Sequence, residues 1–222
     1  MGKLILIPTP IGNLGDITLR ALETLKQVDL LLAEDTRVTQ KLLRHFDISV
    51  PLRSFHSHNE HAVLNQTVEL IANNELTGIV SDAGTPSISD PGFLLVRACI
   101  EAGVLVECLP GPNAVLPALA ISGLPTDRFI FEGFLPPKKG RQKRMEQWIH
   151  EPRTVALYEG PHRLLKTLNQ LVEVLGPDRK VAVVKEISKL HETAIRGTLA
   201  EAVAYFEGTP PKGEFVIVIG GC

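Results

Sequence analysis

The chain has 222 residues, of which 44% are hydrophobic and 22% charged, and this length suffices for one large or two small domains with real cores. The composition excludes a chain that is disordered over most of its length. Its 23 Lys and Arg against 25 Asp and Glu give a formal net charge of −2, so a nucleic acid or an anionic membrane would have to be held by a local basic patch.

Cysteine usage and hydropathy favour a protein of a reducing compartment. Cys99, Cys108 and Cys222 are too few and too scattered for a disulfide framework, which predicts a cytoplasmic location. The apolar run at the N-terminus is short and is followed by two prolines, and no run approaches the length of a bilayer. We therefore expect neither a signal peptide nor a membrane partner.

Short apolar runs alternate with amphipathic stretches through the first half of the chain. They predict strands at 4–7, 30–33, 52–55, 78–80 and 105–109. Helices are expected at 19–28, 63–71 and 93–100, and Asp16 is the expected N-cap of the first. This order predicts a mostly parallel sheet with helices on both faces.

The segment ISGLPTD at 121–127 follows an apolar helix candidate and combines Gly, Pro and Asp, so it predicts a domain boundary, dividing the chain into 1–120 and 121–222. Strands are expected beyond it at 129–132, 154–158, 181–187, 193–195 and 215–219. Helices are expected at 141–149, 164–175 and 199–206. Two successive strands around 186–197 predict a mixed second sheet, so the fold class is α/β with two α/β domains.

Four loops that follow predicted strands of the first half are unusual, and most of them are dense in Gly and Pro. They read TPIGNLGDIT, EDTR, SDAGTPSISDPG and PGPNAVLPALAISGLP. Such loops are either simple rigid turns or a binding cleft that grips a small polar ligand through main-chain groups, and four of them together favour the cleft. Neither G-x-x-x-x-G-K-[ST] nor G-x-G-x-x-G occurs, which disfavours the standard phosphate cradles.

Eight ordered motifs resemble the ribosomal RNA small subunit methyltransferase I (RsmI) family of the tetrapyrrole methylase superfamily. They are IPTPIGNLGDITLRA, AEDTR, FHSHNE, SDAGTPSISDPG, PGPNA with ISGLP, FEGFLP before a basic helix, YEGPHRL and GEFVIVI. The resemblance covers essentially the whole chain. It implies a homodimer with the tetrapyrrole methylase fold that binds S-adenosylmethionine between its two domains. It also implies methyl transfer to the ribose 2′-oxygen of a cytidine in the decoding region of 16S rRNA.

The same resemblance implies which residues contact S-adenosylmethionine. The first domain would contribute Pro10, Ile11, Asp82, Thr85 and Ile88. The second part of the chain, with the PGPNAV motif, would contribute Ala114, Val115, Tyr158 and Phe215. A direct displacement from a sulfonium needs no metal, and we expect none.

Methyl transfer to a hydroxyl requires alignment and either a base for the hydroxyl proton or a cation for the developing alkoxide. Candidates come from the EDTR, FHSHNE and KEISK segments: Glu34, Asp35, Arg37, His58, Glu60, Lys185, Glu186 and Lys189. A salt-bridged strand end is the structural alternative for EDTR. A solvated strand pair of alternating charge is the alternative for KEISK.

The histidine cluster supports a competing hypothesis. His56, His58, Glu60 and His61 read H-x-H-x-E-H, and imidazole and carboxylate at this spacing are suitable zinc ligands. A metal-dependent hydrolase is therefore the alternative from another reaction class. The βαβ order of the surrounding chain argues against it.

A basic cluster supplies the expected RNA contact: Lys138, Lys139, Arg141, Lys143 and Arg144. A solvated helix face is the structural alternative, but this is the densest positive patch of an otherwise slightly acidic chain. It favours RNA, as naked 16S rRNA or the small ribosomal subunit, over a tetrapyrrole or a diphthamide precursor as the methylated substrate. A nucleotide-binding module without turnover is the remaining alternative.

Overall fold

The computed structural model describes residues 2–222, and the chain divides between Asn113 and Ala114 into two compact units. The division precedes helix α5 (Val115–Ser122), whereas the sequence placed it at 120/121, inside this helix. The difference arises because α5 packs against the strands of the second sheet. Its apolar side chains Val115, Ala118 and Leu119 are buried, so the helix belongs with the second unit.

The first unit is built on a sheet of five strands, all parallel, in the order β3-β2-β4-β1-β5. The strands are β1 (Lys3–Leu6), β2 (Leu30–Ala33), β3 (Leu52–Ser54), β4 (Leu76–Val80) and β5 (Leu105–Cys108). A helix lies in each connection between successive strands. The predicted parallel sheet is confirmed, and all the carboxyl ends of its strands lie along one edge.

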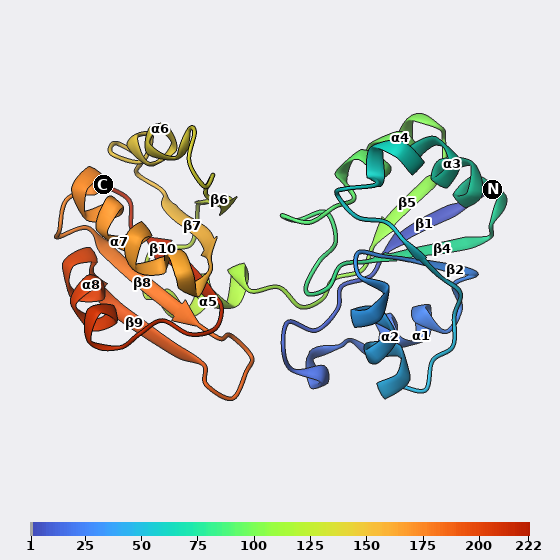
Figure 1. The fold of residues 1–222 in the computed structure, drawn as a ribbon, viewed down its shortest axis with the longest axis horizontal. Coiled ribbons are helices and arrows are strands. Elements are labelled where there is room, and N and C mark those ends of the chain that lie inside the picture. Colours follow the sequence, from blue (N-terminus) through green and yellow to red (C-terminus); the bar gives the residue numbers. More distant parts are fainter. Residues whose placement is uncertain (1) are drawn as a thin grey trace. The chain divides into compact units, whose positions relative to one another are not determined.

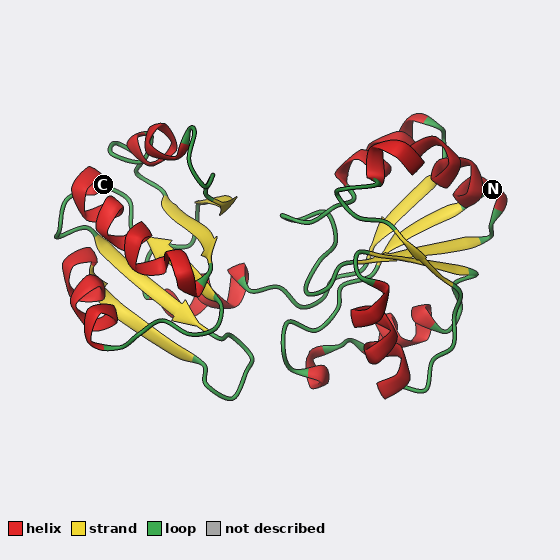
Figure 2. Ribbon diagram, in the orientation of Figure 1, coloured by secondary structure: helices red, strands yellow, loops and turns green. Residues whose placement is uncertain are grey.

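Helices cover both faces of this sheet, as Figures 1 and 2 show. They are α1 (Leu19–Leu25), α2 (Thr36–His45), α3 (Glu60–Asn73) and α4 (Phe93–Glu101). Side chains alternate between the faces along each strand. Ile5 and Leu31 therefore pack with α1 and α2, and Leu4 and Leu32 pack with α3 and α4.

Two local predictions in this unit were wrong or incomplete. Thr18, not Asp16, caps α1, because the Thr18 hydroxyl accepts a hydrogen bond from the Ala21 N–H, and Asp16 lies in a short 3-10 turn (Leu14–Asp16). Helix α2 was not predicted at all. The helix is mostly polar: Val38, Leu42 and Leu43 are the apolar residues among its ten, and only Thr39 and Leu43 are buried.

The second unit contains a mixed sheet in the order β6-β7-β10-β8-β9. Its strands are β6 (Phe129–Phe134), β7 (Thr154–Glu159), β8 (Lys180–Lys185), β9 (Thr193–Thr198) and β10 (Phe215–Ile219). Only β6 and β7 pair in parallel, and the other neighbours are antiparallel. The predicted mixed sheet is therefore confirmed.

One face of the second sheet carries the larger core, formed with α6 (Arg141–Glu146), α7 (Pro161–Leu175) and α8 (Leu199–Gly208). Leu157, Val183 and Ile217 point into it from the strands. Helix α5 also packs on this sheet. Among residues 2–222, no helix is both long and apolar enough to span a membrane.

Candidate functional site

The loops after β1 and β4 are joined at the carboxyl edge of the first sheet. The Thr9 N–H donates to the Gly84 carbonyl at 2.9 Å, and the Gly84 N–H returns a bond to the Thr9 carbonyl at 3.0 Å. The buried Thr9 hydroxyl also donates to the Ser81 carbonyl at 3.1 Å. This isolated antiparallel bridge lies outside the parallel sheet and fixes the two loops against each other.

The loops after β2 and β5 are tied to the same β4 loop. The Asp35 N–H donates to Asp82 Oδ1 at 3.0 Å, and the Thr85 hydroxyl donates to the Pro112 carbonyl at 3.4 Å. Four loops predicted from the sequence as a group thus come together in the structure. We call this surface, formed by residues 8–18, 34–37, 81–92 and 109–113, the loop edge.

The backbone of the β4 loop is shaped for close approach. Gly84 has φ +83°, and a Cβ placed there would lie 3.5 Å from the Ile11 side chain and 3.7 Å from the Pro112 carbonyl. Ser87 and Ser89 also have positive φ, of 70° and 64°, which costs energy in residues with a side chain. The buried Ser87 hydroxyl has no hydrogen-bond partner among the described residues. A strained loop with an unused polar atom is typical of a binding site.

Three carboxyl groups at the loop edge have raised pKa values. Burial raises the pKa of Asp90 to about 6, and the negative charges of Glu34 and Asp82 add to the effect, against a hydrogen bond from Ser81. Burial also raises the pKa of Glu34 and of Asp82. Perturbed carboxyl groups gathered at the end of a parallel sheet mark a functional site.

The charged tetrad EDTR separates into two parts with different roles. Asp35 caps α2 and holds the Arg37 guanidinium at 2.6 Å, and these bonds lower the pKa of Asp35 to about 2. Asp35 and Arg37 therefore form the salt-bridged strand end that was the structural alternative. Glu34 lies next to Asp82, whose N–H donates to Glu34 Oε2 with an N···O distance of 3.5 Å.

Two residues of this region were not among the predicted catalytic or donor-binding positions. Asp90 lies in the same loop as the predicted Asp82 and Thr85, and the second Asp of SISDPG is the signal that could have found it. His56, considered from the sequence only as a metal ligand, follows β3, the neighbour of β2, and its charge acts to lower the pKa of Glu34. The buried His56 Nδ1 atom has no hydrogen-bond partner among the described residues.

The remaining members of the histidine cluster lie apart from this arrangement. His58 and His61 are exposed, and Glu60 begins α3. The His56 and His58 rings are 5.8 Å apart in an edge contact. Within residues 2–222, no group of three His, Cys, Asp or Glu side chains is arranged to hold a metal ion. The arrangement gives the hydrolase hypothesis no support.

The predicted S-adenosylmethionine contacts fall into two groups. Pro10, Ile11, Asp82, Thr85 and Ile88 all lie in loops of the loop edge, and Ile88 is 50% exposed. In the second unit, Ala114 is the N-cap of α5 and Val115 its first residue, while Tyr158 lies half-buried near the end of β7. These positions stay predictions.

Phe215 differs from the other predicted contacts. Its side chain is 2% exposed and its ring packs edge-on against Phe206, with 5.7 Å between ring centroids. It is part of the larger core of the second unit. The side chain serves packing, so a contact of Phe215 with the methyl donor would have to come from its main chain, and this position too stays a prediction.

The KEISK candidates lie at the turn between β8 and β9. Lys189 Nζ is 2.9 Å from Glu186 Oε1 and 2.8 Å from Glu214 Oε2. Burial acts to lower the pKa of Lys189, but the bonds to Glu214 and Glu186 outweigh it and raise the pKa. Lys189 is therefore a protonated partner in an ion-pair cluster, not a base. Lys185, at the end of β8, is half-buried.

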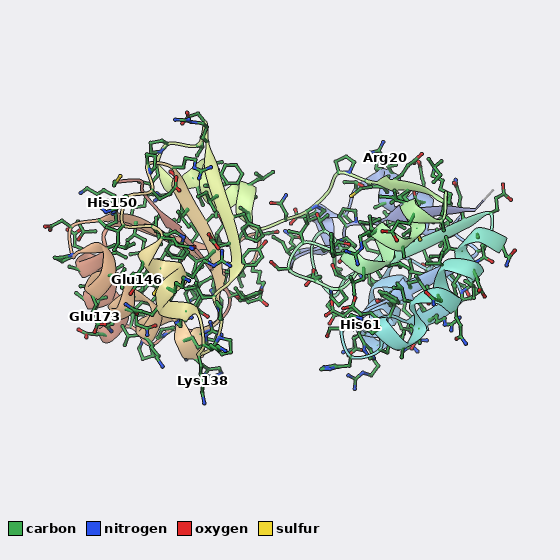
Figure 3. All side chains as sticks on the ribbon, turned by 90° about the horizontal axis from the view of Figure 1, so that it is seen from above. Arg20, His61, Lys138, Glu146, His150 and Glu173 are labelled. Carbon is green, nitrogen blue, oxygen red and sulfur yellow. The ribbon has the colours of Figure 1, made fainter. Side chains whose placement is uncertain are left out.

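The basic cluster is divided between surface and interior. Lys138, Lys139 and Lys143 are exposed, and Figure 3 shows the Lys138 side chain extending away from its unit. The Arg144 side chain is 50% exposed and pairs with Glu132 at 3.4 Å. We call these four residues the basic segment.

Arg141 is the exception, and the structure corrects its assignment to an RNA-contacting surface. It is 5% exposed, and its guanidinium lies 3.6 Å from the buried Glu159 carboxylate. Its Nε also donates to Gln170 Oε1 at 2.8 Å, and Nη2 donates to the Thr167 hydroxyl. Arg163 approaches Glu159 as well, at 3.3 Å. Arg141 thus anchors the N-terminus of α6 to α7.

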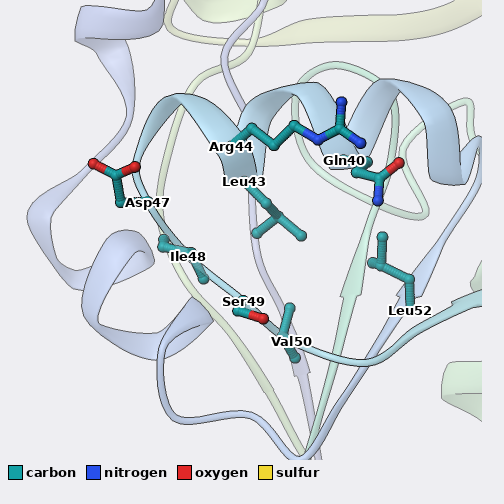
Figure 4. Close-up of a pocket in the computed structure, with 8 residues that line it drawn as sticks. All are labelled: Gln40, Leu43, Arg44, Asp47, Ile48, Ser49, Val50 and Leu52. Atoms are coloured by element: carbon teal, nitrogen blue, oxygen red, sulfur yellow. The ribbon is translucent and has the colours of Figure 1, made fainter.

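A separate cavity of about 470 Å³ lies between α2 and the segment that leads to β3 (Figure 4). None of the residues predicted for catalysis, methyl-donor binding or RNA binding lines it. Its lining residues are Gln40, Leu43, Arg44, Asp47, Ile48, Ser49, Val50 and Leu52. The cavity is therefore distinct from the loop edge.

Comparison with known proteins identifies the family. The family model of tetrapyrrole (corrin/porphyrin) methylases matches residues 3–203. Among solved structures, a uroporphyrin-III C-methyltransferase from Thermus thermophilus is similar, with a TM-score of 0.68, 19% identity, and coverage of 99% of this chain and 97% of that one. A cobalt precorrin-4 methyltransferase superposes with a TM-score of 0.67 at 18% identity, covering 98% of this chain and 94% of that one. These two likenesses concern the fold.

Curated relatives are much more similar in sequence. A protein of Synechocystis named ribosomal RNA small subunit methyltransferase I is 52% identical over 222 residues, covering 100% of this chain and 80% of the relative. Its namesake from Thermotoga maritima is 47% identical, covering 100% of this chain and 99% of the relative. That of Escherichia coli O157:H7 is 47% identical, with coverage of 99% and 78%. The chain therefore belongs to the tetrapyrrole methylase family, in the branch of proteins that carry this name.

The first testable prediction concerns Asp90. Because its folded pKa of about 6 lies above the ordinary 3.8, its stabilising contribution is present below about pH 4 and is lost as the pH rises through about 6. We expect Asp90→Asn to raise the free energy of unfolding near neutral pH by about 1–2 kcal/mol and to flatten its pH dependence. Urea unfolding at several pH values measures both. The exposed Asp178→Asn is the control, and an Asp90 variant with wild-type pH dependence would contradict the assignment.

The second prediction concerns the buried ion pair. Arg141→Met should lower the free energy of unfolding by about 3 kcal/mol, because Glu159 stays buried with only Arg163 as its charged partner. Lys143→Met, on the exposed face of the same helix, should change it by less than about 0.5 kcal/mol. Thermal and urea unfolding compare the two variants. Equal losses would show that Arg141 does not act through burial.

Proposed function

We propose that this protein transfers a methyl group from S-adenosylmethionine to the ribose 2′-oxygen of a cytidine in the decoding region of 16S rRNA. We further propose that it acts in the cytoplasm as a homodimer. The observation that carries the proposal is the similarity to the Thermotoga maritima protein named ribosomal RNA small subunit methyltransferase I. It extends over 221 residues and covers 99% of that relative. The loop edge supports binding of the methyl donor, and the basic segment supports binding of the RNA.

The loop edge fits S-adenosylmethionine as its ligand. Its surface is formed largely by main chain that hydrogen bonds fix between the loops. The carboxyl groups of Glu34, Asp82 and Asp90 suit a cationic sulfonium, because opposite charges attract strongly where water is partly excluded. The ligand carries no phosphate, in agreement with the lack of a phosphate fingerprint in the sequence.

When bound, S-adenosylmethionine supplies an electrophilic methyl group, and no metal is required. The residues proposed to hold it lie in the first unit and at the start of α5 and end of β7 in the second: Pro10, Ile11, Asp82, Thr85, Ile88, Ala114, Val115 and Tyr158. Of these, Asp82 is placed to orient the site by accepting the Asp35 N–H. This hydrogen bond holds the loop after β2 against the loop after β4.

Glu34 is the best candidate to take the hydroxyl proton. A general base needs a pKa raised toward neutrality, and burial together with the Asp82 charge raises that of Glu34. Asp35 is a poor candidate because its pKa is lowered to about 2 by Arg37. Against the effect of burial, the hydrogen bond from the Asp82 N–H and the charge of His56 act to lower the pKa of Glu34.

Methyl transfer itself is the third prediction. With labelled S-adenosylmethionine, small ribosomal subunits or naked 16S rRNA should gain label on a cytidine ribose, and a precorrin-type macrocycle should gain none. Glu34→Gln should lower kcat by about 10²-fold or more because the proton acceptor is removed. Nuclease digestion and mass spectrometry locate the label. Label on the macrocycle, or on neither substrate, would refute the proposed function.

The basic segment generates the fourth prediction. Replacing Lys138, Lys139, Lys143 and Arg144 by Gln should weaken RNA binding and lower the slope of log affinity against log salt by about 0.7 for each phosphate that is no longer neutralised. Titrations by fluorescence anisotropy at several salt concentrations measure the slope. Lys26→Gln with Lys41→Gln, two exposed positions of the first unit, is the control. An unchanged slope would mean that the basic segment is surface only.

A further inference from the structure

Strand β6 ends in a bulge that changes the direction of its last side chain. Phe131 pairs with Ala156 of β7, but Phe134 pairs with Tyr158, so three steps on β6 match two on β7. Gly133 lies at this irregularity with φ +60°, a conformation that favours glycine. Because β6 is the edge strand of its sheet, the extra residue breaks no pairing on its other side.

The bulge brings two phenylalanines to one tyrosine. Residues three apart in a regular strand point to opposite faces, yet the Phe131 and Phe134 rings both contact the Tyr158 ring. Their centroids lie 5.1 Å and 5.4 Å from it, within the range of attractive aromatic contacts. Phe131 and Tyr158 are half-buried, whereas Phe134 is 57% exposed. The result is an exposed ring supported from beneath by two others.

The end of β6 is also fastened to the helix that carries the basic residues. Glu132, between the two phenylalanines, accepts a hydrogen bond from Trp148 Nε1 at 3.3 Å and pairs with Arg144 at 3.4 Å. Trp148 is 3% exposed, so its hydrogen bond to Glu132 starts from the core of the second unit. The supported ring and the basic segment therefore belong to one well-held part of the second unit.

The charges around the exposed ring favour a particular kind of ligand. Lys138 and Lys139 follow Phe134 by four and five residues, so the Cα atom of Lys138 lies within about 14 Å of that of Phe134. An exposed aromatic face beside exposed cations is the arrangement that binds single-stranded RNA, where bases stack and phosphates pair with lysine. An apolar partner protein would leave these cations without a counter-charge.

We propose that Phe134, supported by Phe131 and Tyr158, stacks on an unpaired base of the RNA whose phosphates the basic segment contacts. This inference rests on the proposed function for the identity of the nucleic acid. It adds to that function a side chain that contacts an exposed base. Because every base has a face on which a ring can stack, Phe134 would favour unpaired RNA over duplex RNA but would not favour a particular sequence. Duplex RNA, with its bases stacked on one another, should bind less well at this position.

The test compares Phe134→Ala with the aromatic replacement Phe134→Trp. Phe134→Ala should weaken binding of a single-stranded 16S rRNA oligonucleotide about tenfold, the effect of removing one base stack, while Phe134→Trp should stay within about threefold of wild type. Phe93→Ala, at a 62% exposed ring of the first unit, is the matched control and should bind as wild type does. Anisotropy measures affinity, and circular dichroism checks the fold.

Two further readouts separate stacking from other roles of the ring. The salt slope should be the same in Phe134→Ala as in wild type, because every cation that pairs with a phosphate is still present. Affinity for S-adenosylmethionine by calorimetry and the oligomeric state by light scattering should also be unchanged. Wild-type RNA affinity in Phe134→Ala would overturn the inference. So would a loss confined to donor binding, or dissociation of a dimer, which would assign the ring a different role.

Failure of this inference and failure of the proposed function are distinguishable. If the wild type labels the cytidine ribose and Phe134→Ala binds RNA normally, the function stands and the stacking role is refuted. If the wild type transfers no methyl group to rRNA, the proposed function is refuted whatever the variants do. Weaker RNA binding of Phe134→Ala, with wild-type binding by Phe134→Trp, supports the stacking role.

Discussion

The parallel pairing of the first sheet is the constraint on which the candidate site depends. Parallel strands place all their carboxyl ends at one edge, so loops that lie far apart in sequence begin side by side. The reciprocal bonds between Thr9 and Gly84 then hold the first and third of these loops together. The side chains of Asp82 and Thr85 also connect the loops after β2 and β5 to the loop after β4. A ligand meeting this edge finds main-chain groups already fixed, and little ordering remains to be done on binding.

The first unit gathers acidic side chains at the loop edge, and the second unit carries the exposed basic segment. These charges suit a cationic methyl donor and a polyanionic methyl acceptor. Glu34, Asp82 and Asp90 share one partly buried edge, and the charges of the first two raise the pKa of the third, an unfavourable repulsion that a positive ligand relieves. The exposed lysines of the second unit are solvated by water, which screens their charges from one another until a phosphate binds. A net charge of −2 averages over these two surfaces and reveals neither of them.

The sequence predicts the strands better than the site. The strands at Leu30–Ala33 and Phe215–Ile219 match their predicted bounds, because buried apolar runs between turn residues carry a strong signal. Helix α2 was missed because it has few apolar residues and begins within the charged EDTR segment. The domain division was placed after most of α5 because α5 is apolar enough to belong to either unit. The loop motifs predicted which loops gather but not which carboxyl groups face one another. Asp90 shares its loop with Asp82, but its burial, which raises its pKa, depends on packing that the local sequence does not contain; His56 comes near Glu34 through strand order.

Arg141 shows why charge type alone misassigned one residue of the basic cluster. Within PPKKGRQKR every cation is equivalent by composition, but Arg141 stands four residues before Met145 and seven before Trp148, both buried. The i, i+4 spacing of Arg141 and Met145 is that of the buried stripe of α6, and it puts Arg141 on the inner face of the helix and Lys143 on the outer one. Burial of the guanidinium is tolerable because Glu159, Thr167 and Gln170 satisfy it. Periodicity therefore separates the cation that builds the surface from those that can bind RNA on it, and the same reasoning applies to any basic run at the start of an amphipathic helix.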